Sequence, residues 1–95
     1  MLNINSSVSV TNNEIEIHKL DDEWVFVDKK QEKVAIMNET AFFVWKCVEE
    51  ATQICTQELC CIVSSNYPEL DKLEIERDIV EIVNMMLEEQ LLYVL

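Results

Sequence analysis

The sequence predicts an α+β fold in which a three-stranded antiparallel sheet is followed by three helices. Up to Met37 the apolar residues alternate with polar ones or form short β-branched runs, as they do in strands. From Asn38 onward apolar residues recur every three or four positions, as on the buried face of a helix. Short polar segments separate the strand-like stretches, which favours hairpins and hence a simple meander.

The three expected strands cover residues 14–19, 23–28 and 33–37. The first alternates strictly, so Ile15 and Ile17 share one face while its charged residues face water. The second is apolar on both faces, as expected of a central strand. The third, Lys33 to Met37, would have one free edge. Residues 1–13 are expected to form a flexible segment in front of the domain, with Val8 to Val10 leading into the sheet.

Three helices are expected over residues 39–50, 57–66 and 70–89. Asn38 and Thr56 are suitable N-caps for the first two, because their short polar side chains can accept a hydrogen bond from a first-turn N–H. Pro68 ends the second helix. The apolar residues of the third helix cover a wider arc than one core contact requires. Three strands followed by three helices indicate a winged helix-turn-helix-like domain.

The composition excludes several classes of function. The chain has 95 residues, which suits one domain, and a net charge of −12, which repels nucleic-acid backbones. It contains no glycine, so a glycine-rich phosphate loop is excluded. No apolar run approaches the roughly 18 residues that cross a bilayer, and the first residues do not resemble a secretory signal. We therefore expect a cytoplasmic protein that binds neither nucleic acid nor membrane.

Catalytic and metal-binding patterns are also missing from the sequence. His18 is the single histidine and is most simply a solvated strand residue. Nucleophilic catalysis by a Ser/His/Asp or Cys/His arrangement is therefore disfavoured. Cys47, Cys55, Cys60 and Cys61 lack the spacing of zinc ligands and are expected to be buried, reduced thiols. We expect no enzyme activity, no metal and no cofactor.

Two features remain as a candidate binding surface. The expected edge strand would expose unpaired N–H and C=O groups, with which an extended peptide can pair. The wide apolar arc of the third helix could form the second wall of a groove. On these residues alone, a binding groove and a merely covered edge beside an ordinary core helix are equally favoured.

Three segments resemble the PqqD-like family, the peptide-recognition domains of ribosomal natural-product biosynthesis. They are Trp24 to Asp28, Val34 to Ala41, and the pair Val44-Trp45. The resemblance implies a winged helix-turn-helix-like, peptide-binding domain over residues 14–95. The chain departs from the family after the first helix, where Glu49-Glu50-Ala51 replaces the Asp-Gly that the family tends to have.

The resemblance also implies the position of the site. In the family, the leader of a precursor peptide adds as a strand beside the third strand and packs against the third helix. Carried over to this chain, the peptide-binding candidates are Val34, Ala35, Ile36 and Met37 on the strand and Glu76, Val80, Val83, Asn84 and Leu87 on the helix. Asp78, Ile82 and Met85 lie on the other flank of that helix, so the choice of flank stays open.

These features predict a standalone adaptor that captures a precursor peptide by β-strand addition. It would present the peptide to a separate tailoring enzyme, such as a radical-SAM maturase or a leader peptidase, and would itself be a monomer or weak homodimer. Two alternatives are a winged-helix transcription regulator and a structural subunit that dimerises through its edge strand. The acidic charge disfavours the first, because a recognition helix that bears acidic residues would face phosphates.

Overall fold

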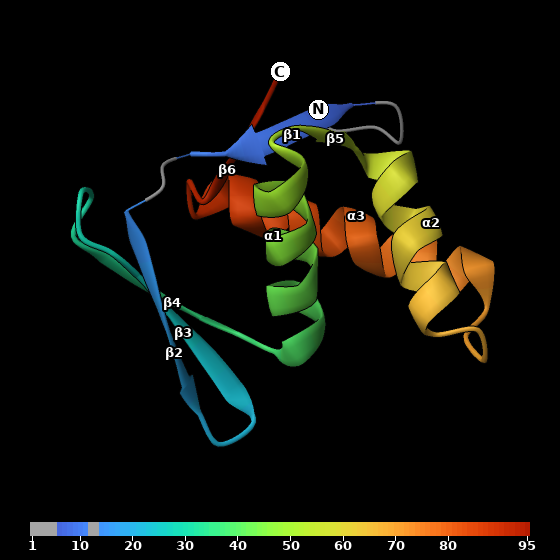
Figure 1. Ribbon diagram of the computed structural model, residues 1–95, viewed down its shortest axis with the longest axis horizontal. Helices are drawn as coiled ribbons and strands as arrows, with labels where there is room; N and C mark the ends of the chain where they lie inside the picture. The colour runs from blue at the N-terminus through green and yellow to red at the C-terminus, as the bar shows by residue number, and fades with distance from the viewer. Residues whose placement is uncertain (1–5, 12–13) are drawn as a thin grey trace.

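The computed structural model describes residues 6–11 and 14–95, which form three helices and two three-stranded antiparallel sheets. The helices are α1 (Glu39–Ala51), α2 (Thr56–Asn66) and α3 (Lys72–Glu88). One sheet joins β2 (Ile15–Leu20), β3 (Glu23–Asp28) and β4 (Lys33–Met37). The other joins β5 (Ile54–Cys55), β1 (Ser7–Val10) and β6 (Leu92–Val94), in that order (Figure 1). The α+β class is confirmed, whereas the expectation of a single sheet is wrong.

The meander β2-β3-β4 packs its inner face on α1 through aromatic side chains. Phe26 of β3 is fully buried, and its ring meets that of Trp45 edge to face with 5.3 Å between centroids. Trp24 stacks in parallel on Phe42 of α1 at 3.7 Å. Such pairs stabilise by about 0.5–1.5 kcal/mol beyond the area they bury, so α1 holds the sheet in a fixed orientation.

The second sheet corrects the expectation for the start of the chain. Residues 1–5 and 12–13 lie outside the described residues, but residues 7–10 form β1 rather than part of a flexible segment. Val8 is fully buried and pairs with Ile54 on one side and Val94 on the other. The local sequence pattern shows that Val8 suits a strand. It does not show what Val8 pairs with, because both partners lie far along the chain.

The helix starts agree with the sequence at one cap and differ at another. The side chain of Asn38 accepts a hydrogen bond from the N–H of Ala41 at 2.8 Å, as predicted for the cap of α1. Thr56, predicted to cap α2, is instead its first residue and is fully buried. Its hydroxyl donates to the carbonyl of Ser6 at 3.1 Å, so it joins α2 to the segment that enters β1.

A chain without glycine must use other residues where the backbone has positive φ. Asp21, in the β2–β3 turn, is one of these and belongs to a type that adopts this conformation readily. The others are Glu32 before β4, Thr52 after α1 and Gln90 after α3. Glu32 precedes β4 and Gln90 follows α3, and hydrogen bonds from Gln31 and Lys33 to Gln90 join these two segments.

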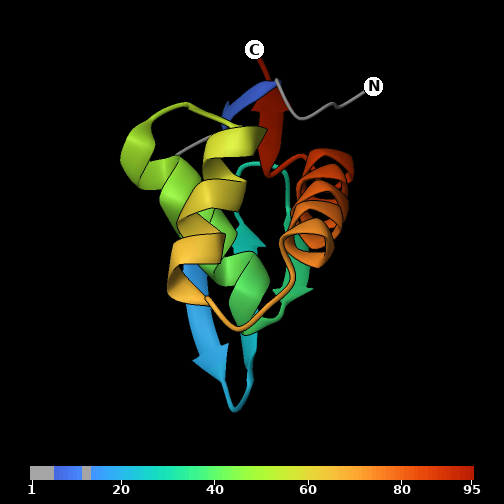
Figure 2. The ribbon, with the colours of Figure 1, turned by 90° about the vertical axis from the view of Figure 1, so that its right-hand side faces the viewer.

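The core lies between the three helices and the inner faces of the two sheets, whose arrangement Figure 2 shows. None of the four cysteines forms a disulfide bond; Cys60 is buried, whereas Cys61 is exposed, contrary to the expectation of buried thiols. No helix in the described ranges combines the length and the apolar content that crossing a bilayer requires.

Candidate functional site

Strand β4 is an edge of the meander, because the strand order is β2-β3-β4. It pairs with β3 on one side, and no described strand pairs with its other side. Successive residues of an antiparallel strand direct their N–H and C=O groups to opposite sides, so about half of the backbone groups of β4 point away from β3. The edge that the sequence predicted is therefore present in the described chain.

The side chains of β4 alternate between the two faces of the sheet. Val34 and Ile36 are each 63% exposed on the outer face. Ala35 is half-buried and packs against the core, and Met37 is 2% exposed within it. Met37 therefore contributes backbone rather than side chain to the candidate surface.

Contacts at both ends show that β4 and α3 run beside each other in opposite directions. At the start of β4, the Lys33 ammonium donates to the side-chain oxygen of Gln90, just after α3, at 3.0 Å. Beyond the other end of β4, Thr40 lines a cavity of about 70 Å³ together with Ile75 and Asp78 from the first half of α3. Figure 2 shows β4 and α3 on the same side of the molecule.

The helical repeat of about 100° per residue divides the surface of α3 into two flanks. One flank carries Glu76, Val80 and Leu87, and the opposite one carries Asp78, Ile82 and Met85.

The two flanks of α3 lie beside different parts of the chain. Leu87 lines a hollow with Leu92 and Tyr93 of β6 and with Lys30 and Gln31 of the β3–β4 loop. Burial raises the pKa of the Cys60 thiol in α2, and the nearby carboxylate of Glu76 raises that pKa further. Asp78, on the opposite flank, lines the cavity beside Thr40 instead. Of the two flanks, that of Asp78 has the contact with Thr40, just beyond β4, so we take the flank of Asp78, Ile82 and Met85 as the candidate second wall.

Burial changes the set of helix residues that a peptide could touch. Val83 is fully buried in the core, so its side chain offers no surface to a peptide. Glu76, Val80 and Leu87 are half-buried and Asn84 is exposed, on the flank of α3 opposite Asp78. Hydrophobic spacing identifies the apolar residues of a helix, whereas its rotation about its axis is decided by packing against distant segments.

The β3–β4 loop carries residues of the site that the sequence did not single out. Asp28 is 1% exposed, and its carboxylate accepts hydrogen bonds from the N–H groups of Lys30 and Gln31 at 3.1 and 3.2 Å. The side-chain amide of Gln31 donates to the same carboxylate at 2.9 Å and to the carbonyl of Gln90 at 3.4 Å. Asp28 thus holds the loop in the shape that reaches the end of α3.

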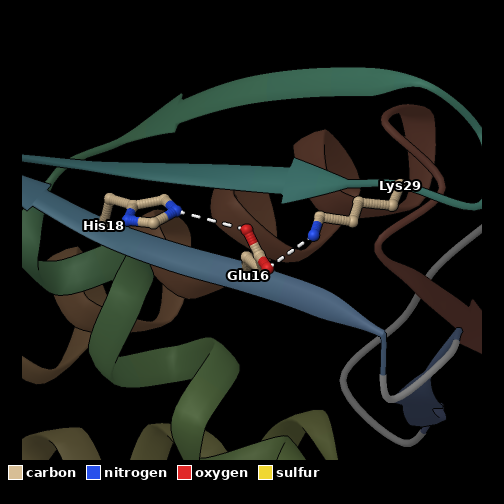
Figure 3. Close-up of polar contacts among 3 residues, drawn as sticks. All are labelled: Glu16, His18 and Lys29. Atoms are coloured by element: carbon tan, nitrogen blue, oxygen red, sulfur yellow. Dashed lines mark hydrogen bonds and ion pairs between the residues drawn. The ribbon is translucent and has the colours of Figure 1, made fainter.

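A second polar group lies on β2, at the opposite edge of the meander (Figure 3). The Lys29 ammonium is 2.7 Å from the Glu16 carboxylate, and the His18 ring lies 3.4 Å from it. Hydrogen bonding from Lys29, and then from His18, lowers the pKa of Glu16. All three side chains are exposed, so this is a solvated surface cluster, as expected for His18.

Within residues 6–11 and 14–95, no group of three or more His, Cys, Asp or Glu side chains could hold a metal ion.

Two solved structures are similar to this fold. One is described as "TbiB1 in Complex with the TbiA(beta) Leader Peptide" and has a TM-score of 0.70 and 18% identity, over 88% of this chain and 93% of that chain. The other is described as "Lasso peptide synthetase B1 complexed with the leader peptide" and has a TM-score of 0.69 and 20% identity, over 90% and 96% of the two chains. At these identities the similarity shows a common fold.

The comparison with curated proteins gives no match. The family model described as "Coenzyme PQQ synthesis protein D (PqqD)" matches residues 23–92. That range contains β3, β4 and all three helices of the described chain, and so includes both sides of the candidate groove. The chain therefore belongs to the PqqD family.

Proposed function

We propose that this protein is a leader-peptide-binding adaptor without catalytic activity of its own. It captures the leader of a ribosomally made precursor in the cytoplasm and presents it to a separate tailoring enzyme, such as a radical-SAM maturase or a leader peptidase. The observation that carries the proposal is the unpaired edge of β4 opposite α3 in a member of the PqqD family. Both similar structures are described as complexes with leader peptides, which supports the same function here.

The leader would add as a fourth strand to the meander, beside Val34 to Met37. Because both existing pairings of this sheet are antiparallel, we expect the leader to run antiparallel to β4. Backbone hydrogen bonds would supply affinity, and alternate side chains of the leader would point toward α3 and select for sequence. If the domain is described as winged helix-turn-helix-like, the meander β2-β3-β4 corresponds to the wing.

The second wall would come from the flank of α3 that carries Asp78, Ile82 and Met85. Ile82 and Met85 are half-buried and pack against the core, so part of each side chain is left for a ligand. This choice replaces the flank of Glu76 and Val80, which lies toward α2 and β6.

Such an adaptor acts by effective concentration rather than by chemistry. Nanomolar to micromolar binding, about 8–12 kcal/mol, would hold a precursor long enough for a second protein to act on it.

The proposal is tested with peptides selected from a random 20-residue display library on the immobilised protein. Each amide of the strongest binder is then N-methylated in turn, and affinity is measured by fluorescence anisotropy. Strand addition predicts that binding is lost at every second position, because only alternate N–H groups face β4. A continuous block of sensitive positions, or none, would contradict strand addition without any change to the protein itself.

Two other functions make different predictions for the same sample. A transcription regulator would shift DNA in a gel at physiological salt, which a net charge of −12 opposes. A structural subunit would dimerise through β4 without any peptide, and the selected peptide would dissociate it. Sedimentation as a monomer or weak dimer, with β4 left for the peptide, is the expected result.

A further inference from the structure

A hollow of about 730 Å³ lies where the β3–β4 loop meets the end of α3 and β6. Its apolar lining comes from Leu87, Leu92 and Tyr93, and its polar lining includes Lys30, Gln31 and Gln90. Gln90 is also the residue to which Lys33, the first residue of β4, donates its hydrogen bond. The hollow is therefore in line with the β4 edge, at the end where that strand begins.

The charge of this hollow is opposite to that of the whole chain. The protein has a net charge of −12, yet the lining of the hollow carries one charged side chain, and it is the cation Lys30. Lys29 and Lys46 form ion pairs with Glu16 and Glu49. No described carboxylate forms an ion pair with the ammonium of Lys30.

A second cation stands beside the hollow in a weakly held position. The ammonium of Lys33 donates to the neutral amide oxygen of Gln90 at 3.0 Å, in an exposed contact. A carboxylate is a stronger acceptor for an ammonium than an amide is, because a charge-assisted hydrogen bond is roughly twice as strong as a neutral one. An incoming carboxylate can therefore replace Gln90 as the partner of Lys33.

We propose that this hollow is a second subsite for the precursor peptide, which takes an apolar side chain together with a carboxylate. The inference rests on the proposed function and extends it to the chemistry of the peptide. A peptide antiparallel to β4 leaves that strand at Lys33, so the residues that follow its strand-forming segment reach the hollow. The apolar side chain packs on Leu87, Leu92 and Tyr93, and an Asp or Glu beside it pairs with Lys30 and Lys33. Precursors of this adaptor therefore carry an apolar-acidic pair on the C-terminal side of the paired segment.

The test is a comparison of the sequences selected by four proteins from the random display library. Wild type is expected to enrich Asp or Glu at a fixed distance after the strand-forming segment. The double variant Lys30→Glu/Lys33→Glu is expected to enrich Lys or Arg at that distance and to bind the wild-type peptides about tenfold more weakly, as for the loss of a charge-assisted hydrogen bond. Lys30→Gln, which is milder, is expected to lose the preference without reversing it, and serves if the double variant does not fold.

The matched control is Lys72→Glu, at the first residue of α3. It makes the same Lys-to-Glu change as each half of the double variant. Lys72 is about 25 Å from Gln90 along the 17-residue helix, since each residue adds 1.5 Å. It is expected to select the same acidic peptides as wild type, with affinities within about twofold, because exposed charges this far apart are screened.

The failures of the two proposals are distinguishable. Peptides with an alternating N-methyl profile but no acidic preference would overturn the subsite and leave the adaptor function standing. An acidic preference on the N-terminal side, or one that survives the double variant, would also overturn the subsite. Failure to enrich any peptide on wild type would overturn the adaptor function and the subsite together.

Discussion

The carboxylate of Asp28 is buried at the end of β3, where a charge without partners would be strongly unfavourable. It accepts hydrogen bonds from two backbone N–H groups and one side-chain amide of the loop that follows it. This residue therefore fixes the loop that brings Gln31 to Gln90. The stability of the β3–β4 hairpin and the shape of the proposed subsite therefore both depend on Asp28.

We expect Asp28→Ala to lower the free energy of unfolding by about 2–3 kcal/mol, because it leaves buried loop donors without an acceptor. Chemical denaturation monitored by tryptophan fluorescence measures this loss. The control is Asp22→Ala in the exposed β2–β3 turn, which is expected to change stability by less than about 0.5 kcal/mol. Equal effects of the two substitutions would show that the loop does not depend on this carboxylate.

Among the elements, the connection from α1 to β5 carries the clearest backbone strain. Thr52 follows α1 at φ 72° and ψ −50°, a conformation that is rare and strained for a β-branched residue. Its carbonyl accepts a hydrogen bond from the Ser9 hydroxyl at 2.6 Å, so the strained turn also supports β1.

Thr52→Gly is expected to stabilise the protein by about 1 kcal/mol, because glycine removes steric strain of about 1–3 kcal/mol but gives the unfolded chain more freedom. A rise in the midpoint of thermal unfolding is the measurement. Gln53→Gly, one residue later, has no positive φ to relieve and is expected to be neutral or destabilising. A lower midpoint for Thr52→Gly than for Gln53→Gly would contradict the strain argument.

The edge of β4 gives a second prediction for an element. Ala35 and Ile36 direct their N–H groups to opposite sides of the strand, so one faces β3 and the other faces the open edge. Proline at the first kind of position removes a ladder hydrogen bond and destabilises the sheet, whereas proline at the second removes only an edge donor. Of Ala35→Pro and Ile36→Pro, we therefore expect one to unfold at a lower temperature and the other to stay folded but lose peptide binding.

Thermal unfolding and anisotropy with a library-selected peptide distinguish the two proline variants. If both proline variants fold and both bind the peptide as tightly as wild type, pairing at this edge is ruled out. The N-methyl profile of the peptide reports on the same hydrogen bonds from the ligand side, so the two experiments must agree.

For the molecule as a whole, the sequence predicts what is local and misses what joins distant segments. The change of period at Met37 and the cap at Asn38 predict β4 and the start of α1, and the structure confirms both. The second sheet was missed because β1, β5 and β6 have two to four residues each and come from three separate parts of the chain. The flank of α3 that lines the groove could not be chosen from the sequence for the same reason. Apolar residues lie on both sides of the buried face of α3. Only packing against other elements fixes the rotation of this helix about its axis.

That rotation leads to a prediction about the groove between β4 and α3, whose walls are separated along the chain by the other two helices. Ile82 and Val80 are both half-buried and lie on opposite flanks of α3, so they form a matched pair. We expect Ile82→Ala to weaken binding of a library-selected peptide about tenfold, as truncation of an apolar interface contact does, and Val80→Ala to change it less than about twofold. Each affinity is compared with the unfolding midpoint of its variant, so that a loss of stability is not taken for a loss of contact. A larger effect at Val80 would place the peptide on the β6 side of α3 and would overturn the proposed wall while leaving the β4 edge as the site of pairing.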